Sequence, residues 1–428
     1  MELRPILSTL LRHKTAAALI VLEIALSCAI VCNALFLIGN RIERINLVSG
    51  VAEDEVVRVQ LAGIGEDDNA DALTRSDLAL LRGLPGVKAA TVTNQVPFVN
   101  SSWNTSVNMT KDQKQPTLSA TVYMGEEQFL DTLGPKIVAG REFTPDEFVE
   151  WTAFSAPDSN VSIPSLIITR RLADKLFPGQ SAVGKSFYSW GDNPIRVVGV
   201  VDHLVRPSDQ GGPTAHEYSM VFPLNVPYSL GGNYLLRTEP GRRAEVLKAA
   251  VAALERNGPN RIILTDNTKT IEELRSEYYR QDRAMVWLLV AVIVALLVVT
   301  ALGIVGLASF WVQQRTKQIG VRRALGATKG QILRYFQTEN FLLATVGIAL
   351  GMLLAYAINQ MLMGKYELPR LPLWYLPIGA AVLWALGQLS VLSPARRAAR
   401  IPPVAAMRSA PFGVPPCRRT MSGCLAWT

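Results

Sequence analysis

The run AMVWLLVAVIVALLVVTALGIVGLASFWV, residues 284–312, contains no charged side chain. A helix needs about 20 consecutive apolar residues to cross the hydrocarbon core of a bilayer, and this run exceeds that length. Three other segments are similar: residues 16–38, in which Glu23 is the single charge, residues 341–363, and residues 371–392. We therefore predict four transmembrane helices in this chain of 428 residues.

The charges divide the chain into an outer block and an inner remainder. Residues 40–283 hold 26 Lys and Arg against 31 Asp and Glu, whereas the whole chain has a net charge of +8. The positive residues outside this block flank the apolar runs, and positive flanks stay in the cytoplasm. We expect a multi-pass protein of a bacterial inner membrane with both termini and residues 313–340 inside. The basic balance then sets topology and predicts no nucleic-acid partner.

The N-terminal segment, residues 1–15, has its leucines and isoleucine at helical spacing, with arginines between them. This pattern predicts an amphipathic cytoplasmic helix lying on membrane lipid. A cleaved signal peptide is the alternative, but the apolar run that follows is longer than the usual 7–15 residues. An uncleaved first transmembrane helix over residues 16–38 fits better. The tail, residues 393–428, is expected in the cytoplasm, and its last fifteen or so residues have no interpretation.

The outer block, residues 39–283, has the pattern of a large mixed α/β domain. Short strand candidates such as EVVRVQL, residues 55–61, alternate with helical patterns such as residues 242–257, which favours two small α/β lobes. We expect Thr74 to cap a helix that ends at Gly83. A charged helical pattern over residues 269–285, capped by Asp266 or Thr268, continues without Gly or Pro into residues 284–312. With the outward end of the first span, it predicts a two-helix stalk.

Two features resemble functional sites, and we weigh each against a simpler interpretation. GQSAVGKS, residues 179–186, has the letters of a phosphate-binding loop, but it follows a helix and leads to a strand, whereas the true motif opens a helix. Glu23 lies in a transmembrane segment, where an ionisable group is by default a functional candidate. It could instead lie near the boundary or face a partner helix. We find no catalytic residues and expect no metal, no cofactor and no enzymatic activity.

The loop between the second and third spans, residues 313–340, combines basic charge with a defined helical pattern. QRTKQIGVRRALGA has helical spacing up to Gly326, a favourable residue just after a helix C-terminus. Thr328 and Gln331 then match a capping box that begins a second helix. Retention inside by charge is the simpler explanation of the arginines. It does not explain the two-helix corner, which suits docking of another protein.

Here the sequence resembles a known family. QRTKQIGVRRALGATKGQILRYFQTENFLL, residues 314–343, resembles the signature of FtsX-type ABC transporter permeases, with Gln318 where an acidic residue is usual and Glu339 at the final acidic position. PARRAARIPPVAAMR, residues 394–408, resembles the closing motif of that family. SLIITRRLADKLFPGQSAVGKSFY, residues 165–188, and IRVVGVV, residues 195–201, resemble the periplasmic core of MacB-type permeases. The order of one span, an outer domain and three spans also matches.

The resemblance implies a permease subunit without a fused ATPase, because the chain begins almost at its first span. Such permeases work as dimers, each chain contacting a separate cytosolic ABC ATPase whose motion reaches the periplasmic domain. Export, with a periplasmic adaptor, is the first expectation. A non-transporting mechanotransmitter that regulates a periplasmic partner and a lipoprotein extractor are the alternatives. The implied ATPase-coupling residues are those of the loop signature: Ile319, Gly320, Arg322, Arg323, Ala324, Gly326 and Ala327.

Overall fold

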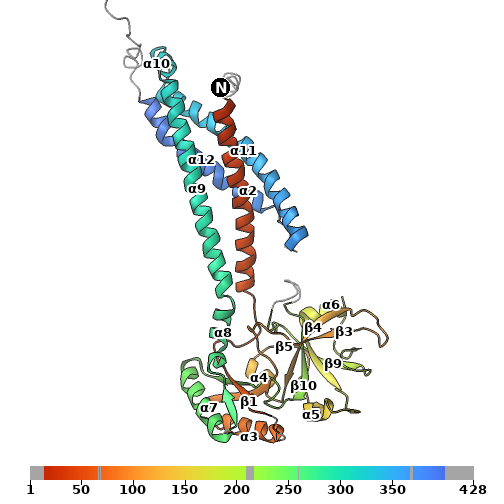
Figure 1. Cartoon of the computed structure of the whole chain (residues 1–428). Coiled ribbons are helices and arrows are strands. Elements are labelled where there is room, and N and C mark those ends of the chain that lie inside the picture. Colours follow the sequence, from red (N-terminus) through yellow and green to blue (C-terminus); the bar gives the residue numbers. More distant parts are fainter. Residues whose placement is uncertain are drawn as a thin grey trace, which may run out of the picture. The chain divides into compact units, whose positions relative to one another are not determined.

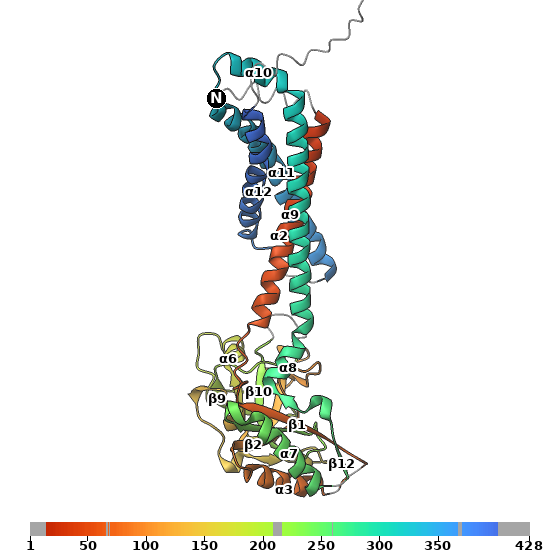
Figure 2. The ribbon, with the colours of Figure 1, turned by 90° about the vertical axis from the view of Figure 1, so that its left-hand side faces the viewer.

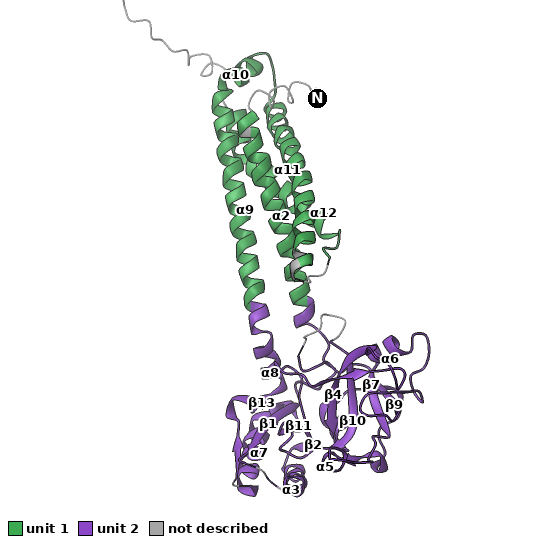
Figure 3. Cartoon of the chain, turned by 45° about the vertical axis from the view of Figure 1, so that its right-hand side comes forward, with its two compact units in different colours: residues 1–42, 284–428 green, residues 43–283 purple. Residues whose placement is uncertain are grey.

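The computed structural model describes residues 14–65, 67, 69–208, 216–258, 260–366 and 370–400. The chain forms two compact units, one of residues 1–42 and 284–428 and the other of residues 43–283 (Figure 3). We call them the helical unit and the α/β unit. The predicted amphipathic helix lies outside the described residues except for Lys14 and Thr15, and the tail beyond residue 400 lies outside them as well.

The helical unit contains four helices that are long and apolar enough to cross a membrane (Figure 1). These are α2 (Lys14–Ile45), α9 (Arg280–Gln314), α11 (Lys329–Tyr366) and α12 (Tyr375–Ala399). A shorter helix, α10 (Thr316–Ala324), joins α9 to α11. Helices α2, α9 and α11 each contain one of the predicted apolar runs, whereas α12 begins at Tyr375, four residues later than the predicted run of residues 371–392. Helix α11 continues unbroken from the loop into its span, as predicted.

Helix α2 is the most buried of the four, and glycines of its neighbours let it approach them closely. A Cβ on Gly351 of α11 would lie 2.5 Å from Cys28 Cβ and 2.7 Å from the carbonyl oxygen of Ala25. At Gly379 of α12, a Cβ would overlap the sulfur of Cys32. Small residues at such crossings are typical of helix packing in membranes, where close van der Waals contact replaces the hydrophobic effect.

Helix α9, in contrast, leaves most of its apolar surface uncovered. Only 11% of its most hydrophobic stretch is buried inside the structure, compared with 56% for α2. Trp287, Leu288, Val299 and Leu302 are each more than half exposed. In Figure 2, α9 and α2 run side by side along the helical unit. The outer surface of α9 is therefore available to lipid or to another helix.

The α/β unit is built on a sheet whose described strands follow the order β12-β1-β11-β2-β4-β10-β7-β9-β5. The strands and their bounds are β1 (Val56–Gly63), β2 (Val87–Thr93), β3 (Asn104–Val107), β4 (Leu118–Gly125), β5 (Ile137–Gly140), β6 (Val149–Glu150), β7 (Ser165–Thr169), β8 (Ser186–Phe187), β9 (Ile195–Val201), β10 (Ser219–Asn225), β11 (Asn233–Thr238), β12 (Arg261–Ile263) and β13 (Lys269–Thr270). Strands β2 and β4 share one residue pair, Thr93 with Gly125. The sheet is weakly joined there, which matches the two predicted lobes.

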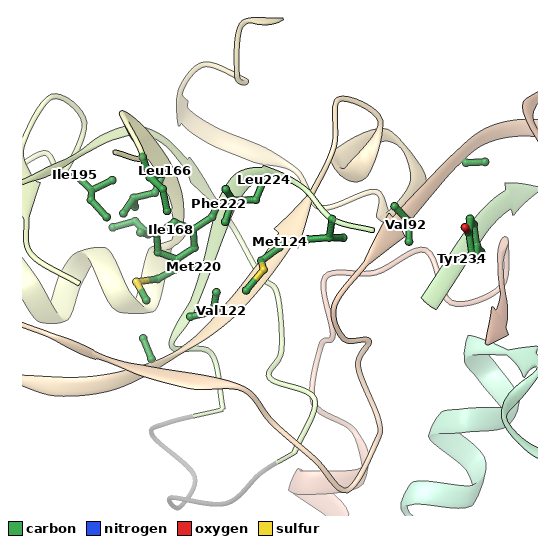
Figure 4. Packing of buried hydrophobic residues seen from close by; sticks show 14 of the residues in the cluster. Val92, Val122, Met124, Leu166, Ile168, Ile195, Met220, Phe222, Leu224 and Tyr234 are labelled. Carbon is green, nitrogen blue, oxygen red and sulfur yellow. The ribbon is translucent and has the colours of Figure 1, made fainter. Parts of the chain in front are cut away.

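Helices cover parts of this sheet. They are α3 (Ala70–Arg82), α4 (Phe129–Leu133), α5 (Trp151–Phe154), α6 (Arg170–Leu176), α7 (Arg243–Asn257) and α8 (Ile271–Tyr278), with short 3-10 turns at Pro145–Glu147, Pro240–Arg242 and Thr265–Asn267. The main core contains side chains from both halves of the sheet, including Val92 and Tyr234 from one half and Phe222 from the other (Figure 4). As the alternating pattern predicts, Val57 and Val59 of β1 belong to this core.

The carboxylate of Glu147 in the α/β unit is held by several hydrogen bonds. Arg141 donates two hydrogen bonds to Glu147, of 2.7 and 2.9 Å. The backbone N–H of Thr144 donates to the same carboxylate at 2.8 Å. These donors, the arginine first, lower the pKa of Glu147 to about 2. The pair fixes the turn that follows β5.

Two helix starts in the α/β unit differ from those predicted. Thr74 does not cap α3, because the helix begins one turn earlier, at Ala70, and the Thr74 hydroxyl donates to the Ala70 carbonyl at 2.7 Å. The cap of α8 is Thr270, not Asp266 or Thr268. Thr270 accepts from the backbone of Glu273 at 3.1 Å and donates its own N–H to the Glu273 side chain at 2.9 Å, which completes a capping box.

The predicted single helix from residue 269 to residue 312 is divided. Helix α8 ends at Tyr278, and α9 begins at Arg280 after a break at Tyr279. Arg275 explains part of this local arrangement, because it donates hydrogen bonds of 2.7 Å to the backbone carbonyls of Ile45 and Leu47 and also pairs with Glu53. It satisfies backbone acceptors at the end of α2, which have no partners inside that helix.

Candidate functional site

The corner between α10 and α11 is formed by one glycine and one capping box. Gly326 has a φ of +95°, a left-handed conformation that glycine adopts without strain. The N–H of Ala327 donates to the Arg322 carbonyl at 3.0 Å and closes the end of α10. Thr328 then donates its N–H to Gln331 at 2.9 Å and accepts from the Gln331 N–H at 3.3 Å. The predicted glycine stop and capping box are confirmed.

A buried ion pair fixes the start of α10 against α11. Arg315 Nη1 lies 3.0 and 2.9 Å from the two carboxylate oxygens of Glu339, and their side chains are 9% and 2% exposed. The Arg315 guanidinium also lies 5.6 Å from the ring of Trp311. Because an unpaired charge is costly to bury, each member holds the other in place. The pair links the first and last charged positions of the loop signature.

A pocket of about 250 Å³ separates the two helices of the corner. Its inner wall is apolar, with Ile319, Ile332 and Phe336 all buried. Arg322 lies at the same pocket and places its guanidinium 5.0 Å from the ring centre of Tyr335. This cation–π contact holds a positive charge next to an apolar cavity.

The seven predicted coupling residues fall into two groups. Ile319 and Gly320 are buried, so they pack α10 against the rest of the helical unit and are not accessible to a second protein. Arg322, Ala324 and Gly326 are exposed. The remaining two, Arg323 and Ala327, are partly exposed, and Arg323 donates to the Ala399 carbonyl of α12 at 3.3 Å.

Two accessible apolar residues were not among the predicted coupling residues: Val321 of α10, and Leu325, which directly follows the end of α10. Leu325 is 83% exposed and Val321 is 46% exposed. They are four residues apart, so they lie on one face of the helix, with Ala324 beside them. The sequence carries no signal for their exposure, because Ile319 in the same segment is also apolar and is buried. We call Val321, Arg322, Ala324 and Leu325 the α10 face.

Glu23, the other predicted site residue, lies more than two turns inside α2 and is partly buried. Its carboxylate packs against Gly303 of α9, where a Cβ would lie 2.5 Å from either carboxylate oxygen. One turn further along α2, Ser27 and Thr300 of α9 share a buried hydrogen bond of 2.8 Å. Glu23 therefore faces a neighbouring helix, which is one of the two simpler interpretations considered for it.

The phosphate-loop look-alike has a different structure from the true motif. It lies between α6 and the strand β8, so no helix N-terminus follows Lys185. The Lys185 ammonium instead contacts the side chain of Gln180 and lies 5.2 Å from the ring of Phe177. As predicted, the segment leads into a strand, and a phosphate there would lack the aligned backbone N–H groups of a helix start.

Comparison with known proteins identifies both units. The family model of the MacB-like periplasmic core domain matches residues 17–254, and the FtsX-like permease C-terminal model matches residues 290–403. The chain belongs to the MacB/FtsX family of ABC transporter permeases. It is a membrane protein with the mixed α/β domain and apolar helices of that family, whose permease subunits are generally not enzymes.

Individual relatives are distant in sequence. The macrolide export ATP-binding/permease protein MacB of Chromobacterium violaceum is 26% identical over 95% of this chain and 63% of its own length. The uncharacterized ABC transporter permease YknZ of Bacillus subtilis is 25% identical over 78% of this chain and 79% of its own length. The crystal structure of the extracellular domain of YknZ from Gram-positive bacteria has a TM-score of 0.30 and 18% identity, covering 48% of this chain and 99% of that one. The chain thus spans less than two thirds of the MacB relative.

Proposed function

We propose that this MacB/FtsX-type permease receives the ATP-driven motion of a separate cytosolic ABC ATPase at the α10 face and transmits it to its α/β unit, for export. The observation that carries the proposal is the α10 face itself. Leu325 directly follows α10 and is 83% exposed. The start of α10 is fixed by the buried Arg315–Glu339 pair, and the turn after it is fixed by the Gly326 corner. A rigid, exposed apolar and basic surface suits docking of a partner.

The proposed topology follows from the charges that flank the helices. Both termini and residues 313–340 are cytoplasmic in a bacterial inner membrane, and residues 39–283 are periplasmic. The domain boundaries proposed from the sequence, 1–15, 16–38, 39–283, 284–312, 313–340, 341–363, 371–392 and 393–428, are kept in this scheme. Export is favoured because the MacB relative is named as a macrolide export protein.

The ends of α2 and α9 support the proposed two-helix stalk. Both helices cross the boundary between the units without interruption, α2 reaching Ile45 and α9 beginning at Arg280. Inside the α/β unit, Arg44 of α2 lies 3.5 Å from Asp282 of α9. A continuous helix resists bending, so movement at one end is carried to the other. Stiff helical connections of this kind suit transmission of force.

A second permease chain is the proposed occupant of the exposed surface of α9. The apolar side chains of this helix are the least buried of the four spans. Part of this surface contacts membrane lipid in either case. A dimer would place two α10 faces beside the two ATPases of one complex. A periplasmic adaptor is the further partner that export would require.

Photo-crosslinking tests the docking proposal. A photoreactive amino acid at Leu325, expressed in the source bacterium, should crosslink to a protein that mass spectrometry identifies as an ABC ATPase. The matched control is Leu353 of α11, which is 70% exposed on an apolar span. An ATPase captured equally from both positions, or from neither, contradicts the proposal.

Charge reversal tests whether docking is coupled to function. The double substitution of Arg322→Glu and Arg323→Glu should abolish permease-stimulated ATP hydrolysis while the protein stays in the membrane. The exposed Arg334→Glu on α11 is the control for added negative charge in the same loop. Normal stimulation in the double variant would show that the ATPase docks elsewhere.

A further inference from the structure

The α/β unit contains an open groove of about 860 Å³ that the coupling function does not use. Its floor comes from β1 and β11, and one wall is the segment from Asn94 to Asn104. Side chains of a strand alternate between its two faces. Val57 and Val59 point into the core, so Arg58 and Gln60 point away from it and line the groove.

Arg58 is a buried cation that forms no ion pair with any residue that the structure describes. Its side chain is 4% exposed, and its Nε donates to Asn233 Oδ1 at 2.9 Å. Its two terminal amino groups have no hydrogen-bond or ion-pair partner among the residues that the structure describes. None of the described residues that line the groove is acidic. Desolvation lowers the pKa of Arg58 to about 10, so it remains charged at neutral pH.

Asn233 fixes the direction of this arginine. Its side-chain N–H groups donate to the carbonyls of Thr93 and Asn94 at 3.1 and 3.0 Å. The remaining amide oxygen is therefore oriented toward Arg58. Because the guanidinium is held through its Nε at the groove, its two terminal amino groups remain available to a ligand there. A planar fork of this kind matches a carboxylate or a phosphate in a bidentate manner.

The other residues of the groove indicate the chemistry of the ligand beyond its anionic group. Asn100, Ser101 and Asn267 are exposed groove residues whose side chains form no hydrogen bond within the described chain. Trp103 is 38% exposed at the same groove, and its ring makes an edge-to-face contact with Trp151 at 5.8 Å between ring centres. Neutral amides and hydroxyls suit a ligand rich in hydroxyl groups, and an indole face packs against the C–H face of a sugar ring. The volume is within the range of small-molecule sites.

We propose that this groove binds an acidic saccharide, with its carboxylate or phosphate on Arg58 and a sugar ring against Trp103. Most of the described lining residues are Asn, Gln, Ser or Arg, so the groove lacks the continuous apolar wall that a lipid chain requires. The site goes beyond ATPase coupling, because it lies entirely in the α/β unit. Failure of the saccharide site would leave the docking proposal at α10 unaffected, and the reverse also holds.

Binding to the full chain in lipid nanodiscs tests this proposal by calorimetry. The probes are a galacturonate trimer, its methyl ester, glucose 6-phosphate, acetate and inorganic phosphate. We expect the trimer or the sugar phosphate to bind at least tenfold more tightly than the methyl ester and than the two simple anions. The two acidic sugars distinguish a carboxylate from a phosphate as the anchoring group. Equal binding of acetate or phosphate would overturn saccharide recognition.

Variants connect the binding to this groove. Arg58→Gln should weaken binding at least tenfold, and Arg196→Gln, at an exposed arginine on β9, should not change it. Because Arg58 is buried, Ser101→Trp provides a second test at the exposed rim and should block binding without affecting folding. The proposal is overturned if binding survives both groove variants. It is also overturned if the wild type binds no saccharide at ligand concentrations up to about 10 mM. A short peptide with a free terminal carboxylate is a further probe, and the proposal is also overturned if this peptide binds more tightly than the acidic sugars.

Discussion

Replacing Gly326 by alanine tests whether the corner between α10 and α11 depends on a left-handed backbone. A Cβ at Gly326 meets no atom within 4 Å, so the substitution creates no clash. The whole effect therefore comes from its φ of +95°, which costs an L-residue about 1–2 kcal/mol. A difference of that size corresponds to a change of about 5- to 30-fold in the population of the native corner.

Gly330 provides the matched control for this substitution. It also has open space at the Cβ position, but it lies in the first turn of α11 with no left-handed φ. Gly330→Ala should leave the corner unchanged or stabilise it by up to about 1 kcal/mol, because alanine favours a helix more than glycine does.

Hydrogen exchange of the full chain in nanodiscs measures the difference. The N–H of Ala327, which bonds the Arg322 carbonyl at 3.0 Å, should exchange about 5- to 30-fold faster in Gly326→Ala than in the wild type. ATPase stimulation should fall in the same variant if a rigid corner transmits motion. Identical exchange in the Gly326 and Gly330 variants would refute the reasoning.

Three further predictions concern other parts of the chain. Glu147→Gln should lower the stability of the α/β unit by about 1–2 kcal/mol at pH 7. Because the folded pKa of Glu147 is depressed to about 2, the stability difference between wild type and variant should have its full size above the unfolded pKa and vanish as the pH falls through 2. Denaturation at several pH values measures this dependence. Arg315→Met or Glu339→Leu alone should lower the stability of the helical unit by about 3–5 kcal/mol, and the double variant should lower it by less than either. Thermal unfolding in detergent measures these losses, and additive losses would contradict a coupled pair. Gly351→Ala should destabilise the helical unit by about 1–3 kcal/mol through overpacking, and Gly364→Ala, which has open space, should not; equal melting temperatures would contradict the close packing of α2.

The four apolar helices were predictable because their signal is local and strong. An uncharged run such as residues 284–312 has few stable alternatives to a membrane-spanning helix. The corner at Gly326 was predictable for a similar reason, since left-handed glycines and capping boxes depend on residues within one turn. The alternating Val57 and Val59 likewise placed one face of β1 in the core.

Features that depend on tertiary contacts were not predictable. Thr74 has the chemistry of a cap, but α3 begins earlier and uses its hydroxyl inside the helix. The sequence does not indicate that Ile319 is buried and Leu325 exposed, because both are apolar residues of the same short basic segment. The partner of Arg315 lies 24 positions away along the chain. The lack of an ion-pair partner for Arg58 among the described residues becomes apparent only when the neighbouring strands are placed around it.

The length of α9 has a consequence for the membrane around it. Its uncharged run of residues 284–312 would rise about 43 Å as a straight helix, whereas the hydrocarbon core is about 30 Å thick. Such hydrophobic mismatch is relieved by tilting of the helix or by local thickening of the bilayer. Most of α9 is uncovered by its own chain, so the surrounding acyl chains feel this mismatch directly. Acyl-chain length should therefore influence the resting tilt of α9.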